Sequence, residues 1–419
     1  MTKSSYQAAV IGAGLVGSAA ALALARAGLS VALVEPRQAA APDDSWDIRV
    51  YAISPDSQAL LDALGAWPGL DAARTQAVYR MDVHGDASGE LLLDAYAAGV
   101  PRLATILESA LLQQALWQAV EAHGNIHIIF PTLKRARWHQ GLWGAVKAQE
   151  NIDLFCPANV SDVAWASPHS AIALDNGRVL AAELVVGADG AHSMIRQRAG
   201  IEAKATPYGQ SGVVANFETE KPHRGTAFQW FRRLRPGCGD IVAYLPLPGN
   251  RMSLVWSTAT EHAQELLALG EAEFCRQVEQ AGESRLGGLR LLTRPAAFPL
   301  RLMQTDSPVR AGCALVGDAA HGVHPLAGQG VNLGFGDVAA LAEVMARRGK
   351  SACGDPALLE RYARRRAGPV ARMQFVTDSL WRLFGRDERL AGLARNAGMA
   401  LLNKMEPAKS ALIHEAFFN

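Results

Sequence analysis

The sequence predicts an α/β protein that combines a mixed sheet and its helices with an inserted antiparallel sheet and a helical C-terminal region. Three observations lead to this class. An apolar segment near the N-terminus runs into a glycine-rich turn and then an Ala-rich helix. Short apolar segments between glycines and prolines fill residues 211–258, a pattern typical of antiparallel strands. Beyond residue 341 the chain has helical periodicity to its end.

Length and charge limit the class of partner. The chain has 419 residues, enough for more than one domain, and 41 Lys and Arg residues balance 40 Asp and Glu residues. A net charge of +1 provides no basic field for nucleic acid, so we expect a small-molecule ligand. The five cysteines form no C-x-x-C pair and have no zinc-like spacing, which predicts no metal site and reduced thiols in a cytosolic protein.

The first element is a strand, turn and helix built around a G-x-G-x-x-G motif, and a second apolar strand, 31–34, ends at Glu35. In such a motif the first glycine permits a tight turn, the second lets the backbone approach a pyrophosphate, and the third allows close packing of helix on strand. Glu35 would accept hydrogen bonds from ribose hydroxyls. We therefore expect a dinucleotide at Gly12, Gly14, Gly17 and Glu35, and these residues alone leave NAD and FAD open.

The next segment contributes Arg49, ahead of a helix that ends at Gly65. This arginine is either a solvated side chain or a cation beside the bound nucleotide, and the sequence leaves both open. Residues 79–100 alternate and contain glycine, which predicts strands of the separate sheet. A helix over 107–123 follows, and part of its sequence recurs 26 residues later, so that a local duplication covers about 115–157.

A second loop of Gly and Asp follows strands predicted over 160–165, 171–174 and 184–186. It reads Gly187-Ala188-Asp189-Gly190 and precedes a short helix. Ligands gather at the carboxyl ends of strands in α/β sheets, so Asp189 is a candidate nucleotide contact, with an ordinary β-turn as the alternative.

The inserted sheet is rich in aromatic side chains, most of which we expect to pack in a core rather than to contact substrate. A helical stretch over 261–281 completes this unit, and Arg294-Pro295 returns the chain to the first domain. The strands are predicted over 213–217, 227–231, 241–245 and 252–256.

Residues 315–341 are crowded with glycine between a short strand, which ends at Gly317-Asp318, and an Ala-rich helix. So much glycine indicates positive φ angles or a close approach of backbone to a ligand. The helical end of the chain carries a basic run at 364–366 beside apolar residues. It forms either a membrane-surface or partner-docking face, or a solvated basic helix packed on the domain.

Three fingerprints therefore occur in order along the chain: 12–17 with Glu35, 187–190, and 317–321. Together they resemble the fingerprints of the single-component flavin aromatic hydroxylases, over nearly the whole chain. Such a resemblance implies a Rossmann-like FAD-binding domain with an inserted substrate domain.

Within that superfamily, the run 324–334 with Asp337 is similar to the signature of the flavin hydroxylases of ubiquinone biosynthesis. The segments 47–49 and 208–210 are similar to that family too. The duplication at 115–157 departs from the family's pattern, so we transfer no residue roles to it.

The resemblance implies that FAD is the cofactor, with Asp318 on the ribitol hydroxyls, Asp189 near the pyrophosphate and Arg49 at the flavin. The helix that begins near Gly330 would direct N–H groups and its positive dipole end at negative charge on the reduced ring. His324 and Pro325 would line the pocket where oxygen reacts. The loop residues expected against the ring are Gly328, Gln329, Gly330, Val331 and Asn332.

The implied reaction is OH transfer from a flavin C4a-hydroperoxide, formed with O2, to a lipophilic, polyprenylated phenol. Tyr244 is the candidate base that ionises the phenol. The electron donor is left open between NAD(P)H and a reductase protein, because we find no second dinucleotide motif. Three alternatives remain: an FAD-dependent oxidoreductase of another class, a hydroxylase of another aromatic substrate, and a non-catalytic flavin subunit of a biosynthetic complex.

The predicted organisation is a cofactor domain in three parts, with the second sheet inserted between them. We expect a cytoplasmic protein, and the helical end leaves membrane or complex association open. The cofactor domain covers 1–78, 101–199 and 295–348, the substrate sheet 79–100 and 200–294, and the helical region 349–419.

Overall fold

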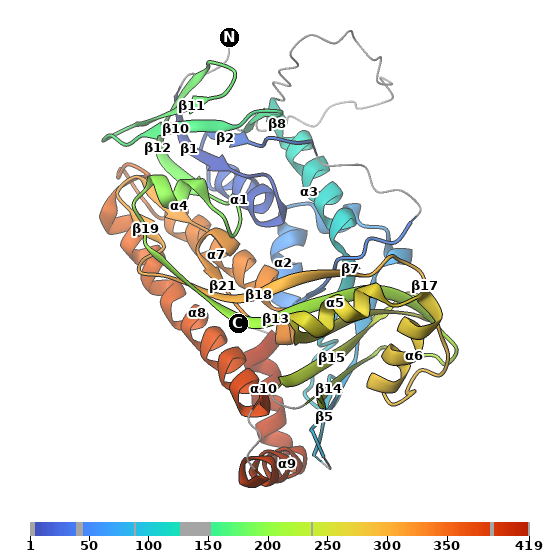
Figure 1. Ribbon diagram of the computed structural model, residues 1–419. Coiled ribbons are helices and arrows are strands. Elements are labelled where there is room, and N and C mark those ends of the chain that lie inside the picture. The colour runs from blue at the N-terminus through green and yellow to red at the C-terminus, as the bar shows by residue number, and fades with distance from the viewer. Residues whose placement is uncertain are drawn as a thin grey trace.

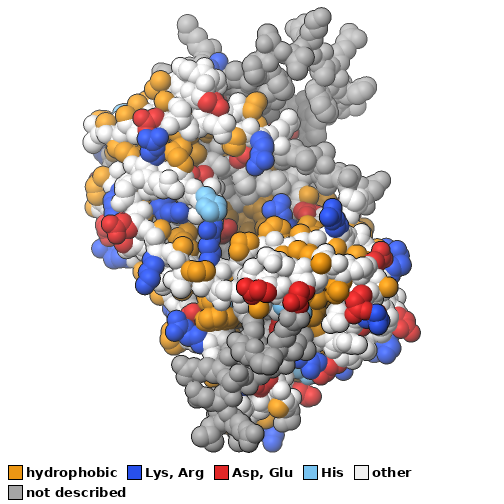
Figure 2. Space-filling view, viewed as in Figure 1, with side chains coloured by type: hydrophobic (Ala, Val, Ile, Leu, Met, Phe, Trp, Pro, Cys, Tyr) orange, Lys and Arg blue, Asp and Glu red, His pale blue; other side chains and the backbone are white. Residues whose placement is uncertain are grey.

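The computed structural model describes residues 5–38, 45–87, 89–125, 152–235, 238–385 and 389–417. A first sheet with its helices lies above a second sheet, and the long helix α8 runs down one side past both (Figure 1). On the face shown in Figure 2, basic and acidic side chains are interspersed and hydrophobic side chains gather across the middle. The predicted combination of a mixed sheet, an antiparallel sheet and a helical end is confirmed.

The first sheet brings the three fingerprint loops together. Strands β1, β12 and β20 are parallel neighbours, and their carboxyl ends lead to Gly12, Gly187 and Gly317. Loops that follow adjacent parallel strands meet at one edge of the sheet, so motifs about 300 residues apart share one site. The strands are β10 (Val160–Ala164), β11 (Ser170–Leu174), β12 (Val179–Gly187), β1 (Ser5–Ile11), β2 (Val31–Val34), β9 (Ile152–Phe155) and β8 (Gly124–Asn125), with β20 (Cys313–Leu315) beside β12 and β19 (Val309–Arg310) beside β20.

Helix α1 (Leu15–Arg26) packs against both α3 (Ser109–His123) and α7 (Gly330–Ala346), and all three contribute to a core shared with this sheet. Their contact is close because α1 is rich in alanine and its inner residues are almost fully buried. Residues 126–151, which contain most of the predicted duplication, lie outside the described residues.

The second sheet is antiparallel except where β14 pairs with β5. Its strand β18 pairs with β13 as far as Thr305, so this sheet extends past the boundary predicted at 294. Pro295 directly precedes β18, a position where the missing N–H costs no ladder bond. The order is β21 (His321–Gly322), β18 (Ala296–Thr305), β13 (Ala203–Thr219), β16 (Arg251–Ala259), β15 (Cys238–Leu247), β14 (Thr226–Arg235), β5 (Arg80–His84) and β6 (Glu90–Asp94), with β17 (Leu289–Leu291) on β13.

Side chains alternate between the two faces of this sheet. One face packs on α5 (Thr260–Ala268) and α6 (Glu271–Ala281) through a core that contains Trp230, Tyr244 and Trp256. The other face is turned toward the first sheet. A small third sheet of β3 (Val50–Ile53), β7 (Ala104–Glu108) and β4 (Gln76–Val78) links the two.

The C-terminal helices α8 (Pro356–Gly385), α9 (Arg389–Asn403) and α10 (Glu406–Phe417) are tied to both sheets. Arg366 of α8 donates from Nε to buried Asp337 of α7 at 2.6 Å, and Asn396 of α9 donates to Asp86 at 2.8 Å. In the part of the chain that is described, we find no helix long and apolar enough to cross a bilayer.

Candidate active site

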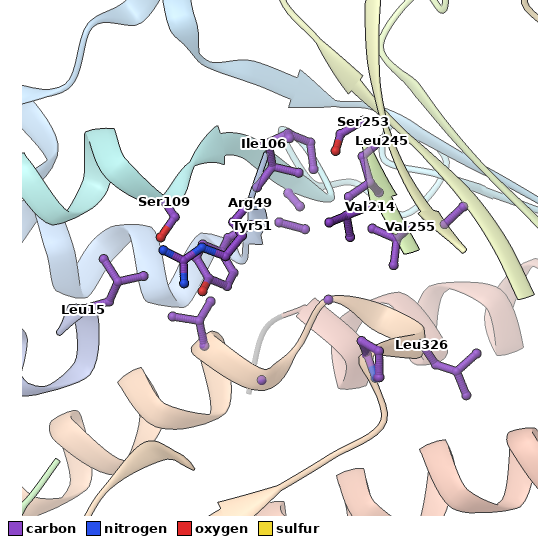
Figure 3. Close-up of a pocket in the computed structure, with 18 of the residues that line it drawn as sticks. Leu15, Arg49, Tyr51, Ile106, Ser109, Val214, Leu245, Ser253, Val255 and Leu326 are labelled. Carbon is purple, nitrogen blue, oxygen red and sulfur yellow. The ribbon is translucent and has the colours of Figure 1, made fainter. Parts of the chain in front are cut away.

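A cavity of about 760 Å³ lies where the carboxyl edge of the first sheet faces the second sheet (Figure 3). Its volume is in the range of ligand and cofactor sites. Arg49, Tyr51 and Ser109 lie together at one end, and Val214, Leu245, Ser253 and Val255 of the second sheet lie at the other. The cavity thus has two chemically different halves.

The three glycines of the first motif have different roles. A Cβ on Gly12, whose φ is +100°, would lie 2.5 Å from the carbonyl oxygen of Ala188, and one on Gly17 would lie 1.8 Å from the oxygen of Gly12. These two glycines allow backbone to pack on backbone. Gly14 lines the cavity, and a Cβ there would meet nothing within 4 Å. Of the three glycines of this motif, Gly14 is therefore the one whose backbone is accessible to a ligand.

The two acids that follow the first two fingerprint strands are bonded to the protein itself. Glu35 accepts a hydrogen bond from the N–H of Ala13 at 2.6 Å, which holds the glycine-rich turn. Asp189 accepts from Ser193 Oγ at 2.5 Å and from Met194 N at 2.7 Å, at the start of α4 (Met194–Arg198). Neither lines the cavity, so we infer that they shape the loops.

Asp318 is the acid that faces the cavity. It follows β20 and its side chain is exposed to the open space, while protein surrounds its other sides. Burial raises the pKa of this carboxyl group, against the lowering effect of His321 and Arg301. A hydroxyl group that donates a hydrogen bond to Asp318 would compensate for the lost hydration.

Arg49 also lines the cavity, which favours the second of its two predicted roles. Its carbonyl oxygen accepts from Ser109 N at 2.9 Å, so β3 is tied to the start of α3. Tyr51, one strand period further on, lines the same end, and burial raises its pKa. Sequence reasoning missed Tyr51 and Ser109. Residues 48–52 all line the cavity, so the alternation of a strand would not have distinguished Tyr51.

The loop before α7 turns its backbone to the cavity and its amide side chains away. Pro325, Gly328, Gly330 and Val331 line the space. Asn332 Oδ1 accepts from Ser54 N at 3.0 Å, its Nδ2 donates to Ala52 O at 2.8 Å, and it also donates to Gln329 Oε1 at 3.0 Å. Asn332 therefore fastens the loop to β3, and neither Asn332 nor Gln329 is in the cavity wall.

His324 lies behind the cavity rather than in its wall. Its ring is 1% exposed, packs edge-on against Tyr208 and has Nε2 3.4 Å from Gln210 Oε1. Burial lowers its pKa to about 4, so the ring is neutral at pH 7. The expectation that His324 lines the pocket does not agree with this position, whereas Pro325 does line it. The motif located the turn, but not which way this side chain points.

Tyr244 is also outside the cavity. Its hydroxyl donates to the carbonyl oxygen of Val278 in α6, and burial raises its pKa far above the usual value. The neighbouring Ala243 and Leu245 line the cavity, so strand alternation turns Tyr244 to the opposite face. This position argues against a role as base, and we leave Tyr244 out of the proposed site.

The residues present fit FAD. Helices α1 and α7 both begin at the cavity, and in the described chain neither N-terminus has a side-chain cap. Their free N–H groups and dipoles favour negative charge, as on a pyrophosphate and on a reduced flavin. Two uncapped helix ends in one cavity match a long, anionic ligand.

The sequence assigned the second sheet to the substrate but did not predict which of its residues line the far half of the cavity. The wall of this half is mostly apolar and is formed by side chains from several strands, with Gln229 and Ser253 as polar members. Alternation of side chains along the strands of the second sheet was the available sequence signal for these residues. It indicates that the sheet has two faces, but not which of them is covered by α5 and α6. The apolar residues are Val78, Met81, Leu103, Ile106, Val214, Ala243, Leu245 and Val255.

Comparisons with known proteins agree with this geometry. A family model described as FAD binding domain matches residues 5–140 and 169–376. The 3-demethoxyubiquinol 3-hydroxylase of Escherichia coli (strain K12) is 34% identical over 403 residues, 95% of this chain and 95% of that protein. Ubiquinone hydroxylase UbiL of Rhodospirillum rubrum is 34% identical over 410 residues, 97% of this chain and 88% of that protein.

Among solved structures, p-nitrophenol 4-monooxygenase PnpA from Pseudomonas putida DLL-E4 matches with a TM-score of 0.73 at 16% identity, over 98% of this chain and 97% of that one. At this identity the match shows the fold alone. The family model covers most of the chain, and the two hydroxylases exceed 30% identity over nearly all of it. The chain therefore belongs to the FAD-binding-domain family and, within it, to the flavin hydroxylases of ubiquinone biosynthesis.

Proposed function

We propose that this chain hydroxylates the aromatic ring of a lipophilic ubiquinone precursor, with FAD as cofactor and O2 as the oxygen source. One observation carries the proposal: a single cavity joins a half lined by backbone and charge to a half lined by apolar side chains. A cofactor in the first half and a substrate ring in the second would meet with little water between them.

Bound FAD would supply the electrons and activate oxygen. The backbone at Gly14 and the start of α1 would bind the pyrophosphate, and Asp318 would accept from ribitol hydroxyls. The start of α7 at Gly330 and Val331 would place N–H groups against the ring, with Arg49 as a nearby cation. The apolar half would exclude water and bind the substrate's ring and side chain.

The cofactor assignment is tested by Asp318→Ala. We expect purified Asp318→Ala to lose most of its FAD, measured by the flavin absorbance per chain, because the ribitol loses its acceptor. Asp306→Ala is the matched control, since that carboxylate pairs with Arg310 at the surface. An Asp318→Ala protein with the same flavin absorbance per chain as wild type would contradict the assignment of Asp318 to FAD binding.

The reaction class is tested with isotopic oxygen. Purified protein, a chemical or enzymatic reductant and a quinol or phenol substrate are incubated under ¹⁸O2, and the product is analysed by mass spectrometry. One ¹⁸O atom in the ring is the expected result. Oxidised substrate without ¹⁸O would favour another class of flavin oxidoreductase, and no turnover with any reductant would favour a non-catalytic flavin subunit.

We also propose that the exposed face of α8 contacts an anionic membrane surface, from which a lipophilic substrate would come. This face carries Arg361 and Arg364 together with Phe375, which is 72% exposed, and Val376, which is 47% exposed. Sedimentation with vesicles that contain anionic lipid should carry the wild type, and Phe375→Glu should weaken it. Equal sedimentation with neutral and anionic vesicles, unchanged by the substitution, would contradict this contact.

A further inference from the structure

The apolar half of the cavity contains a hydroxyl group whose hydrogen bonding is not satisfied by the protein. Ser253 lies in the middle of the second sheet, on β16, and lines the cavity beside Leu245 (Figure 3). Its residue is 1% exposed, and Oγ has no hydrogen-bond partner among the described residues. The residues before and after it, Met252 and Leu254, are in the core on the opposite face.

A second unsatisfied polar atom lies next to this serine. Asn216 of β13 is directly opposite Ser253 in the register of the two strands, and its side chain is 0% exposed. Its Nδ2 donates to the carbonyl oxygen of Asp47 at 2.8 Å, which fixes the amide group. Its Oδ1 has no partner in the described part of the chain. Side chains that oppose each other on adjacent strands lie close together, so the two oxygens form one polar corner.

This corner lies at the seam between the two halves of the cavity. Asn216 is bonded to Asp47, the next residue Ile48 lines the cavity, and Arg49 belongs to the cofactor half. A buried hydroxyl group without a partner is unfavourable, and alanine would fit an apolar wall without that cost. The Ser253 hydroxyl lowers the stability of the protein unless it forms a hydrogen bond, and it faces a ligand cavity. A hydrogen bond to the ligand would explain why a serine is present at this position.

We propose that Ser253 Oγ hydrogen-bonds an oxygen substituent on the substrate's ring, while Asn216, which does not line the cavity, fixes the neighbouring backbone at Asp47. The inference deepens the proposed function and rests on it. The ring then lies against Val214, Leu245 and Val255 with its oxygenated edge held at β16. A fixed edge determines which ring carbon faces the flavin, so Ser253 acts on binding and on the position of hydroxylation.

The experiment compares a pair of ring ligands in wild type and Ser253→Ala. One ligand is a methoxy-substituted phenol with a short prenyl chain, and the other is the same ring with hydrogen in place of the hydroxyl group. Binding to the FAD-loaded protein is followed by the perturbation of flavin absorbance. Wild type should bind the phenol about tenfold more tightly than the deoxy ligand, and Ser253→Ala should lose this preference while it keeps its affinity for the deoxy ligand.

Ser257→Ala is the matched control, because Ser257 is on the same strand, is 3% exposed and is not in the cavity wall. It should retain the preference, and all variants should retain FAD. Ser253→Cys keeps a side chain of similar size with a weaker donor and should give an intermediate preference. With a substrate that turns over, Ser253→Ala should raise KM more than it lowers kcat and should yield more than one hydroxylated isomer.

The outcomes separate the two proposals. A Ser253→Ala protein that keeps the wild-type preference and a single product isomer would overturn the role of Ser253, whether or not the protein is a hydroxylase. A wild type that prefers the phenol and loses that preference in Ser253→Ala, but incorporates no ¹⁸O, would leave the contact standing and overturn the proposed reaction. If Ser253→Ala does not fold, equal ligand preference in Ser253→Cys and wild type overturns the contact.

Discussion

The two halves of the cavity recognise their ligands by different means. The cofactor half is formed by loops that present backbone, with Gly14, Gly190, Gly328 and Gly330 in its wall. The substrate half is formed by side chains that project from the strands of a sheet. Recognition by backbone requires glycine at fixed, closely spaced positions, whereas recognition by side chains is spread over strands far apart in sequence. This difference explains why the residues of the cofactor half can be identified from sequence motifs, whereas those of the substrate half cannot.

The largest expected effect separates two glycines of one motif. Gly17→Ala places a Cβ 1.8 Å from the oxygen of Gly12, which neither backbone can relieve, so we expect unfolding free energy to fall by more than about 3 kcal/mol. Gly14→Ala meets no protein atom within 4 Å and points into the cofactor half. It should fold normally and lose FAD. Chemical denaturation of the apoproteins and FAD titration measure the two effects.

Equal loss of stability in both variants would contradict this division of roles. Both glycines would then be required for the fold, and neither would have a specific role in binding FAD. A Gly14→Ala protein that binds FAD with wild-type affinity would likewise show that the backbone there does not contact the cofactor.

A substitution in the other half should give the reverse pattern. Val255→Phe enlarges a side chain that faces the cavity from β16. We expect FAD content to remain that of wild type and KM for the aromatic substrate to rise at least tenfold, because the ring and the phenyl group compete for one space. Steady-state kinetics and flavin absorbance measure both. Loss of FAD with little change in KM would place the cofactor, rather than the substrate, against this sheet.

Much of the fold could be predicted because its signals are local. The strand, turn and helix at Gly12 depend on neighbours in sequence. The predicted strands of the inserted unit recur in the structure, although β13 is much longer than the predicted 213–217 and the helical stretch 261–281 is divided into α5 and α6. The prediction also identified Gly14, Asp318 and Pro325, which do line the cavity. In each case the backbone conformation around the motif determines where the residue lies.

The direction of individual side chains could not be predicted in the same way. Glu35 lies near the predicted place, but its carboxylate binds the N–H of Ala13. The backbone at Asn332 was expected against the flavin, but its side chain holds β3 through Ala52, an interaction that joins residues 280 positions apart in sequence. Only tertiary packing decides such partners. The same holds for Ser253, which no motif marks and which depends on the face of β16 that α5 and α6 leave free.

A smaller effect is expected from pH, at His324, a buried residue that does not line the cavity. His324 has a pKa of about 4 in the folded protein, below the value of about 6.5 expected when unfolded. Between these values the unfolded state binds more protons, so stability falls as pH falls, by up to about 1.4 kcal/mol per pH unit from this group. His324→Gln should remove this part of the dependence between pH 6.5 and 4.

Urea denaturation of wild type and His324→Gln across this range checks the prediction. The two curves of stability against pH should run parallel above about pH 6.5 and converge below it. Curves that stay parallel down to pH 4 would mean that His324 has the same pKa in the folded and unfolded states. Its ring would then not be buried away from solvent.

The smallest effect is expected from Tyr244→Phe. The substitution removes one hydrogen bond to Val278 O, but that carbonyl still accepts from Gly282 N at 3.1 Å, so we expect a stability loss of about 1 kcal/mol. The kcat and its pH profile should match wild type, because the tyrosine faces α6 while Ala243 and Leu245 face the cavity. Removing a general base would instead lower kcat by roughly 10²-fold or more. Such a loss, with FAD and KM retained, would mean that the faces of β15 are reversed and that the substrate half has been assigned to the wrong side of the sheet.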